Sequence, residues 1–263
     1  MSAPVDSPPA RNSVPGTRPQ GAQDEPQAAA RVREMFGRIA PRYDFLNHLL
    51  SFSLDRVWRR RTARRFRHIL SRPGARVLDL CCGTGDLALA LARARSEESG
   101  KQGTVVLGAD FVHEMLVHAR RKGPSRTAVH YLEADALSLP FADASFDLVT
   151  AAFGFRNLAN YRHGLEEIRR VLRPGGEVGI LEFSEPRGAL IGPLYRFYFT
   201  KILPRVAGAI SSNAEAYSYL PSSVAKFPIE KELAGLMGAV GFDAVSYQLW
   251  TGGIVALHTA RRR

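Results

Sequence analysis

The chain has 263 residues, of which 45% are hydrophobic, and it carries a formal net charge of +11. This length suits one large domain with additions or at most two small ones, and this apolar content is enough for a full core. The apolar runs are short and broken by Arg, Asp or Gly, so none approaches the roughly 20 residues that span a bilayer. The two cysteines, Cys81 and Cys82, are adjacent, which argues against a disulfide framework or a metal site and favours a cytoplasmic protein.

The N-terminal segment is unlike the rest of the chain. Residues 1–27 are rich in Pro, Ser, Gly and Gln and contain no apolar run, so we expect a disordered tail without a signal peptide. The positive charge is concentrated in residues 31–72, where twelve Arg face three acidic residues. This segment fits a solvated Arg-rich face, contact with an anionic membrane surface or contact with nucleic acid, and membrane contact is the favoured binding interpretation.

The folded part is predicted to begin at residue 28 and to form a single domain, residues 28–263. Apolar residues recur at three- and four-residue spacings from there, with Pro41 interrupting the pattern, and a further helix is predicted over residues 54–70. Residues 28–72 thus form a predicted helical cap.

After the cap, short apolar runs alternate with amphipathic helices, which predicts a parallel sheet covered on both faces. The predicted strands are residues 75–80, 104–110, 128–135, 146–153 and 177–184, and the helices are residues 86–95, 112–122 and 161–172. Residues 185–228 break this alternation with a mostly helical, aromatic-rich insertion. A helix over 229–240 and strands over 243–250 and 253–259 end the chain, and the short "WTGG" link makes the last pair an antiparallel hairpin.

The first predicted strand leads into the glycine turn "VLDLCCGTGD". Gly83 and Gly85 permit a positive φ and close approach of the backbone to a ligand, and with Ala88 they read G-x-G-x-x-A. Taken alone, the pattern fits a dinucleotide site or a structural turn as well.

Three carboxylates at the ends of the first three strands narrow the choice of ligand. Asp79 can meet an amino or cationic group, Asp110 can accept both hydroxyls of a ribose, and Asp135 with Ala136 can meet an adenine amino group. Each Asp alone also fits a helix cap or a turn. Together they fit a ligand with a ribose, an adenine and a positive charge but no pyrophosphate, which is S-adenosylmethionine rather than NAD.

These stretches resemble class I S-adenosylmethionine-dependent methyltransferases. The resemblance covers the sheet region in "VLDLCCGTGD", "GADFVHEML", "EADALSLPFADASFDLV" and "VLRPGGEVGILEFS". It implies an α/β, Rossmann-like fold with a seven-stranded, mostly parallel sheet of order 3-2-1-4-5-7-6 and an antiparallel last strand. Helices would flank the sheet, with N-terminal helices and a helical insertion before the last helix and hairpin.

Five further stretches are similar to the ubiquinone/menaquinone biosynthesis C-methyltransferase family: "FGRIAPRYDFLNHLLSFSLDRVWRR", "FGFRNLAN", "RRVLRPGGEVGILEFS", "AYSYLPSSVAKFP" and "TGGIVALH". This resemblance spans about residues 30–259. It implies C-methylation of a polyprenylated quinol ring by S-adenosylmethionine, with demethylmenaquinol as the favoured acceptor. The family often has Ser where this chain has Ala152, which removes one hydrogen bond to the cofactor worth about 1 kcal/mol.

The resemblance also implies the roles of individual residues. Arg156 and Asn157 would face the quinol oxygens at the end of the fourth strand; for Arg156 the alternative is a structural clamp on Asp44 or Glu182. The implied catalytic residues are Arg156, Asn157, Tyr43 and Asp44. The implied cofactor contacts are Asp79, Gly83, Thr84, Gly85, Asp110, Asp135, Ala136 and Ala152.

The substrate would be held by Asn47, Tyr217 and Tyr219, with residues 185–228 as a lid, although core packing explains these tyrosines equally well. No metal is required for the transfer, and His113, His118 and His163 are expected at the surface.

Other functions stay open at this point. The fold also serves RNA and other small-molecule methyltransferases, the glycine loop fits an NAD-dependent oxidoreductase, and Ala152 is the one hint of an inactive scaffold. A naphthoquinol and a methoxybenzoquinol substrate are equally compatible with the residues. We expect a cytoplasmic protein at the inner face of the membrane, with a quinol as partner, no nucleic acid, and room for a homodimer.

Overall fold

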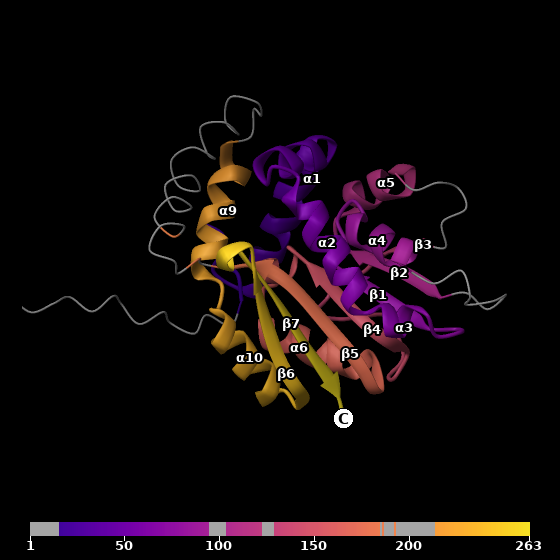
Figure 1. The fold of residues 1–263 in the computed structure, drawn as a ribbon. Coiled ribbons are helices and arrows are strands. Elements are labelled where there is room, and N and C mark those ends of the chain that lie inside the picture. The colour runs from indigo at the N-terminus through magenta and orange to yellow at the C-terminus, as the bar shows by residue number, and fades with distance from the viewer. Residues whose placement is uncertain (1–15, 95–103, 123–128, 185, 187–191, 193–213) are drawn as a thin grey trace, which may run out of the picture.

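The computed structural model describes residues 16–94, 104–122, 129–184, 186, 192 and 214–263. Within them, seven strands form one sheet of order β3-β2-β1-β4-β5-β7-β6, which helices flank (Figure 1). The strands are β1 (Arg76–Leu80), β2 (Val105–Asp110), β3 (Val129–Glu133), β4 (Phe146–Ala152), β5 (Leu172–Phe183), β6 (Phe242–Trp250) and β7 (Val255–Arg262). The helices are α1 (Glu25–Leu50), α2 (Leu54–Arg65), α3 (Arg67–Leu70), α4 (Asp86–Ala94), α5 (His113–Lys122), α6 (Tyr161–Val171), α9 (Ala214–Lys226) and α10 (Glu230–Ala239).

The predicted strand order is confirmed. Strands β1 to β5 pair in parallel, whereas β7 runs antiparallel to both β5 and β6. The turn between β6 and β7 is the 3-10 segment η4 (Thr251–Gly253), which makes the last pair the expected hairpin. Parallel pairing brings the carboxyl ends of β1, β2, β3 and β4 to one edge of the sheet, where their loops meet.

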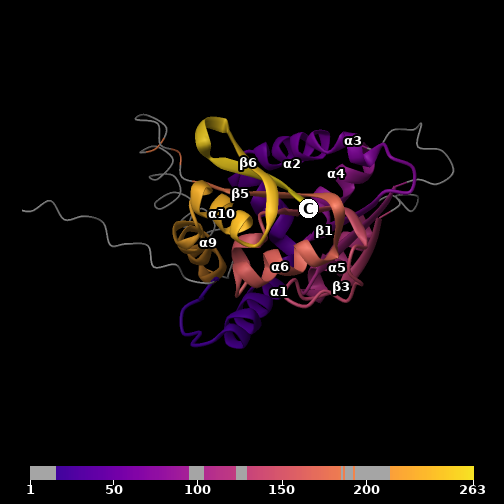
Figure 2. The same cartoon turned by 90° about the horizontal axis from the view of Figure 1, so that it is seen from below.

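The sheet has a core on each face, as alternate side chains require. Val77 of β1 packs with α2, α3 and α4, and its neighbour Leu78 belongs to the core formed with α6 and α10. In Figure 2 these two groups of helices lie on opposite sides of the sheet. Gly179 of β5 leaves the space that the fully buried ring of Phe66 occupies, since a Cβ there would lie 2.5 Å from Phe66 Cε2.

Three boundaries differ from those predicted. The helix expected over residues 54–70 is split at Phe66, whose backbone leaves helical geometry while its ring enters the core. Pro41 does not interrupt α1: proline lacks the N–H of one helical hydrogen bond, but the buried Ile39 and Ala40 pack this part of the helix in an apolar cluster with α5. The predicted boundary at residue 27 between tail and helix is wrong, since α1 begins at Glu25.

The residues just before α1 also make defined contacts. The Thr17 N–H donates to the Leu158 carbonyl at 2.7 Å, and Arg18 Nη1 donates to the Ala159 carbonyl at 2.7 Å. Composition could not indicate this order, because both bonds are made to backbone carbonyls of a segment that lies far away in the sequence. Residues 1–15 and most of the predicted insertion 185–228 lie outside the described residues. Among the helices of the described part, none is both long and apolar enough to cross a bilayer.

We predict that Gly179→Ala lowers the free energy of unfolding by about 1–3 kcal/mol, because the added methyl group meets the Phe66 ring. Urea unfolding measures this loss. The matched control is Gly235→Ala on α10, where a Cβ meets no atom within 4 Å and alanine favours the helix by about 1 kcal/mol. Equal destabilisation by both substitutions would contradict the packing of Phe66 against β5.

Candidate active site

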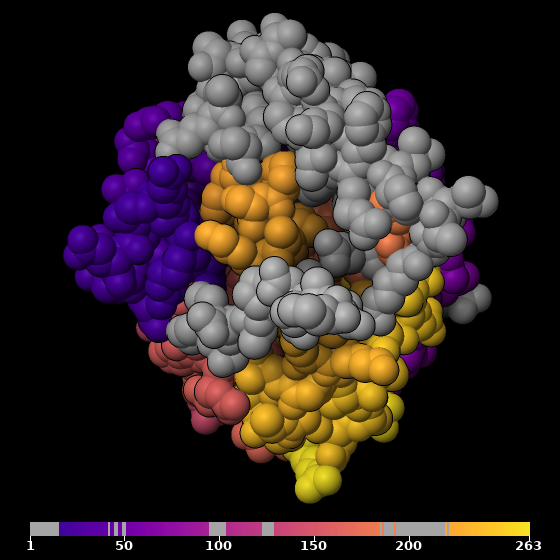
Figure 3. Space-filling model, turned by 90° about the vertical axis from the view of Figure 1, so that its left-hand side faces the viewer, coloured from indigo at the N-terminus to yellow at the C-terminus, as the bar shows by residue number. Residues whose placement is uncertain are grey.

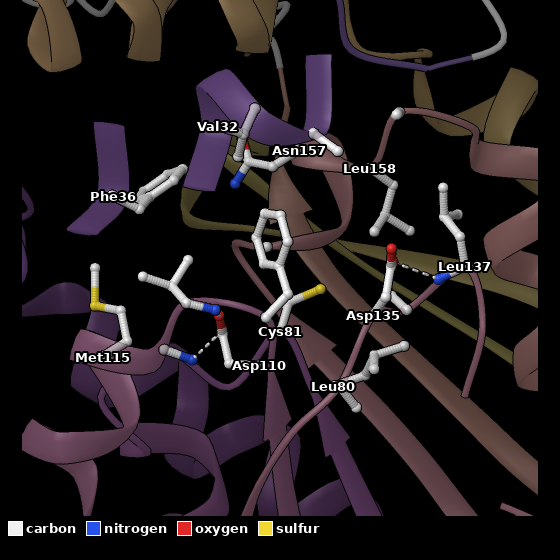
Figure 4. Close-up of a pocket in the computed structure, with 18 of the residues that line it drawn as sticks. Val32, Phe36, Leu80, Cys81, Asp110, Met115, Asp135, Leu137, Asn157 and Leu158 are labelled. Atoms are coloured by element: carbon white, nitrogen blue, oxygen red, sulfur yellow. Dashed lines mark hydrogen bonds between the residues drawn. The ribbon is translucent and has the colours of Figure 1, made fainter. Parts of the chain in front are cut away.

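A solvent-open hollow with about 700 Å³ of empty space, open solvent included, lies at the carboxyl edge of the sheet, beneath α1. Figure 4 shows Val32 and Phe36 of α1 on one side of it and the strand-end residues Asp110 and Asp135 on the other. Its remaining walls come from the ends of β1 and β4 and from the loops after β2, β3 and β4. The lining residues are Ala29, Val32, Phe36, Tyr43, Leu80, Cys81, Gly83, Asp110, Phe111, Val112, Met115, Ala134, Asp135, Ala136, Leu137, Phe153, Gly154, Asn157, Leu158 and Ala159.

The glycine loop forms the floor of this hollow. Gly83 and Gly85 have φ of +55° and +81°, as expected for a tight turn. At Gly85 a Cβ would collide with the hydroxyl of Tyr131 on β3. A side chain is thus excluded at Gly85 by both conformation and space.

Asp110 holds the loop from the end of β2. Its Oδ2 accepts the Gly83 N–H at 2.7 Å, and its Oδ1 accepts the Val112 N–H at 2.9 Å. Burial raises the pKa of Asp110 to about 6, against the opposing effect of these backbone donors. Each carboxylate oxygen keeps a lone pair, so Asp110 can still accept hydroxyl hydrogens from a ligand in the hollow.

Asp135 and Ala136 line the same hollow from the loop after β3. Asp135 Oδ1 accepts the Leu137 N–H at 2.9 Å, as the dashed line in Figure 4 shows, while the side chain of Ala136 is buried. A carboxylate thus lies beside apolar side chains in the wall of the hollow. The carboxylate suits the amino group of an adenine, and the apolar side chains suit its ring.

Asp79 lines a second, smaller hollow with about 310 Å³ of empty space, open solvent included, which Tyr43 also lines. Its Oδ1 accepts the Thr150 hydroxyl at 2.9 Å, whereas its buried Oδ2 has no hydrogen-bond partner among the described residues. Burial raises the pKa of Asp79 to about 7. An unpartnered buried carboxylate oxygen is costly unless a donor arrives, so Asp79 fits the amino group of the expected adenosyl cofactor. Ala152, Gly83 and Thr84 line this second hollow too.

Tyr43 of α1 separates the two hollows and lines both. Burial raises the pKa of its phenol, and the nearby charges of Arg156 and Arg59 and a hydrogen bond with Asn47 act in the opposite direction. Asn47 therefore contacts Tyr43 from one turn further along α1 but lines neither hollow, whereas Tyr43 lines both.

Asp44 fastens α1 to the glycine loop. Its Oδ1 accepts the hydroxyl hydrogen of Thr84, and its Oδ2 pairs with Lys122 Nζ at 2.6 Å. Lys122 also pairs with Asp86 at the start of α4. Asp44 is absent from the lining of both hollows, so the structure favours a positioning role for it.

Arg156 occupies the 3-10 segment η2 (Phe155–Asn157) just after β4. Its Nη1 donates to Glu182 Oε2 at 3.0 Å and to the Phe153 carbonyl, and its backbone N–H donates to Glu182 Oε1 at 3.0 Å. Both side chains are at least 95% buried. The structure thus favours the clamp on Glu182 over direct contact with a ligand, since Arg156 stands behind the wall of the larger hollow. Removing one partner of such a pair costs about 3–5 kcal/mol.

Asn157 does line the larger hollow. Its Oδ1 accepts the Tyr219 hydroxyl hydrogen at 3.1 Å, and the Tyr219 hydroxyl also pairs with Thr17 Oγ1 at 2.9 Å. In Figure 3, α9, which carries Tyr219, lies beside the N-terminal residues drawn in indigo. The side chain of Tyr217 lies outside the described residues.

Several site residues carried no signal in the sequence. Lys122, Asp86, Arg59 and Thr17 come from separate segments, and only the fold brings them to the glycine loop or to Tyr219. His113 and His163 are exposed, as predicted, and His118 is half-buried on α5.

The sequence and the fold are similar to those of known proteins. The sequence model of the ubiE/COQ5 methyltransferase family matches residues 24–262. A protein of Thermus thermophilus named demethylmenaquinone methyltransferase is 49% identical over 87% of this chain and 100% of its own length. A protein of Geotalea uraniireducens named ubiquinone/menaquinone biosynthesis C-methyltransferase UbiE is 43% identical over 88% of this chain and 96% of its own.

Two solved structures show the same fold at low sequence identity. The [4+2]-cyclase SpnF is 18% identical with a TM-score of 0.62, covering 89% of this chain and 96% of its own. A SAM-dependent methyltransferase from Aquifex aeolicus is 18% identical with a TM-score of 0.54, covering 77% and 89%.

We predict that Asp79→Asn stabilises the protein at pH 8 but not at pH 4. The folded state keeps the Asp79 proton up to about pH 7, whereas the unfolded chain loses it near pH 4. The stability that protonation contributes is therefore present below pH 4 and is lost as the pH rises to 7. An amide at this position cannot ionise, so the difference in unfolding free energy should grow by up to about 4 kcal/mol across this window.

Urea unfolding at pH 4, 6 and 8 measures this difference. Asp143→Asn removes a carboxylate whose side chain is 73% exposed and serves as the control. A difference between Asp79→Asn and the wild type that is the same at all three pH values would disprove the buried, proton-holding state of Asp79.

Proposed function

Because this chain belongs to the ubiE/COQ5 methyltransferase family, we propose that it methylates a ring carbon of a polyprenylated quinol in menaquinone or ubiquinone biosynthesis, with demethylmenaquinol as the favoured acceptor. The observation that carries the proposal is the 49% identity over the whole length of a relative named demethylmenaquinone methyltransferase. Relatives at 42–43% identity carry that name or the name UbiE, so a benzoquinol acceptor is the alternative.

The methyl donor is S-adenosylmethionine, which when bound supplies a methyl group activated by a sulfonium. Asp110 suits the ribose hydroxyls, Asp135 and Ala136 suit the adenine, and the unpartnered oxygen of Asp79 suits the amino group. Because Gly83 and Gly85 have no side chain, the backbone of the loop can approach the ligand closely. Ala152 contributes only a methyl group at the smaller hollow.

The apolar part of the larger hollow suits a quinol ring. Val32 and Phe36 of α1, Met115 of α5 and Leu158 after η2 present hydrocarbon surface there. Burying a flat, apolar ring against such side chains is favourable by about 25 cal/mol per Å² of apolar area. The polar groups Tyr43 and Asn157 remain at the wall to orient the ring oxygens.

A ring carbon becomes nucleophilic when the neighbouring hydroxyl loses its proton, so the site must stabilise a phenolate. Tyr43 is the hydroxyl donor best placed for this, because it lines the hollow and feels the positive charges of Arg156 and Arg59. Arg156 then acts through Tyr43 and through the clamp on Glu182. Asn157, held by Tyr219, would orient the ring oxygen or the water that accepts its proton.

The decisive experiment is methyl transfer from labelled S-adenosylmethionine to chemically reduced demethylmenaquinol and, in parallel, to a 2-methoxy-6-polyprenyl-benzoquinol. We expect product from the naphthoquinol and a loss of kcat on the order of tenfold to a hundredfold in Tyr43→Phe, because one donor to the phenolate is removed. Affinity for S-adenosylhomocysteine should be unchanged by this substitution.

Tyr247→Phe on β6, at a residue that lines neither hollow, is the matched control and should keep full activity. Measurable binding of S-adenosylhomocysteine without product from either quinol would overturn the quinol assignment but leave the cofactor assignment intact.

We further propose that the turn between α1 and α2 contacts an anionic membrane at its cytoplasmic face. Phe52 on this turn is 75% exposed, and Leu54 and Val57 in the first turn of α2 are 36% and 54% exposed. Phe52 and Ser53 have positive φ values of 51° and 59°, which a folded chain tolerates only where the surroundings fix them.

Basic side chains follow this apolar turn along α2. Arg56, Arg60, Arg64 and Arg67 line one wall of a shallow groove whose other wall includes Arg93 of α4. An exposed aromatic residue beside such a row is typical of peripheral membrane binding, since burial of the ring adds to attraction for anionic headgroups. The prenyl tail of a quinol would keep the substrate at the same surface. The predicted homodimer and the absence of nucleic-acid binding stay predictions.

Vesicle flotation tests the membrane contact. The protein should float with vesicles rich in phosphatidylglycerol, less with phosphatidylcholine and less at 0.5 M salt, because exposed charges are screened within roughly 4 Å at that salt concentration. Phe52→Ser combined with Val57→Ser should reduce flotation severalfold. Leu249→Ser on β6 removes an apolar side chain of similar exposure (48%) and should have no effect. Flotation that depends neither on the charge of the lipid nor on the salt concentration would contradict the proposed contact.

A further inference from the structure

A carboxyl group and a guanidinium face the smaller hollow without pairing with each other. Asp79 and Arg59 both line it, yet no ion pair within 4.0 Å joins them in the described part of the chain. Among the residues that the structure describes, none forms a hydrogen bond with Asp79 Oδ2. An acceptor and a cation that share a buried space but remain apart are typical of a site for a ligand that carries both charges.

Arg59 is firmly positioned. It is 7% exposed on α2, its Nη1 pairs with Asp55 and lies 3.7 Å from Asp86 Oδ2, and its guanidinium carbon lies 5.2 Å from the centre of the Phe153 ring. The hydrogen bonds and ion pairs described for this guanidinium all involve Nη1. Its Nη2 and Nε therefore remain as donors, and a guanidinium binds a carboxylate best through two such donors.

Resting on the proposed use of S-adenosylmethionine, we propose that Arg59 binds the α-carboxylate of the methionine part of this cofactor, while Asp79 Oδ2 accepts a hydrogen bond from its α-ammonium. The nearby Asp55 and Asp86 hold the guanidinium in place and leave its other edge for the ligand. Arg59 is on this account a cofactor-binding residue and takes no part in the methyl transfer.

The charges of the hollow support this pairing. The interior has a low effective dielectric constant, so a buried zwitterion is stabilised only where each of its charges meets an opposite one. Asp79 supplies the negative charge and Arg59 the positive charge, and the positive charge of Arg59 also acts to lower the raised pKa of Asp79. The alternative is that Arg59 only ties α2 to α4 through Asp55 and Asp86.

Ligands that differ in these two groups separate the alternatives. Calorimetric titration would compare S-adenosylmethionine, its decarboxylated form, which keeps the amine but lacks the carboxylate, and 5′-methylthioadenosine, which lacks both. We expect Arg59→Gln to weaken binding of S-adenosylmethionine by roughly tenfold to a hundredfold. Binding of the decarboxylated form and of 5′-methylthioadenosine should not weaken, which also shows that the variant is folded.

Two further variants sharpen the test. Arg59→Lys keeps the charge but not the two-donor geometry and should show an intermediate loss for S-adenosylmethionine alone. Arg60→Gln, the exposed neighbour on α2, should change no affinity. Equal weakening of all three ligands by Arg59→Gln, or weakening of none, would overturn the proposal. A wild-type protein that binds none of the three would instead contradict the use of S-adenosylmethionine itself.

Discussion

The site exists only because α1 is held across the carboxyl edge of the sheet. Strands β1, β2, β3 and β4 provide the glycine loop and the carboxylates, but α1 provides Tyr43 and the apolar wall. Polar side chains hold α1 in this position. Asp44 accepts a hydrogen bond from the Thr84 hydroxyl and forms an ion pair with Lys122, which also pairs with Asp86. These side chains are only partly exposed, so their attraction is screened less than that of a surface ion pair.

The sequence predicted the features that depend on neighbours in the chain. Alternating apolar runs and helices indicated the parallel sheet, and the "WTGG" link indicated the terminal hairpin. The residues at strand ends, Asp79, Asp110 and Asp135, meet at one edge because parallel strands all finish there. Local patterning therefore sufficed for the strands, the helices and the carboxylates at the edge of the sheet, whereas the strand order came from the resemblance to class I methyltransferases.

What the sequence did not predict depends on contacts between distant segments. The partner of Arg156 was open between Asp44 and Glu182, and only the placement of β5 beside β4 decides for Glu182. Arg59 was one of twelve Arg in a basic segment and had no feature of its own, since its burial follows from how α2 packs against Phe153, which lies just after β4. The fold alone does not identify the reaction either, because the structure named as the [4+2]-cyclase SpnF shares this architecture with a TM-score of 0.62. Substrate class rests on the family-specific sequence around the hollow.

The hydrogen bond between Thr17 and Tyr219 has a practical consequence for how this protein is prepared. The region shared with the family begins at residue 24, and a recombinant version trimmed to that region would look complete by alignment. It would nevertheless lose Thr17, which steadies the hydroxyl that in turn holds Asn157 at the wall of the hollow. A bulky affinity tag fused close to Thr17 would crowd the same place. Purification handles therefore belong at the C-terminus, where Arg263 is exposed and remote from the site.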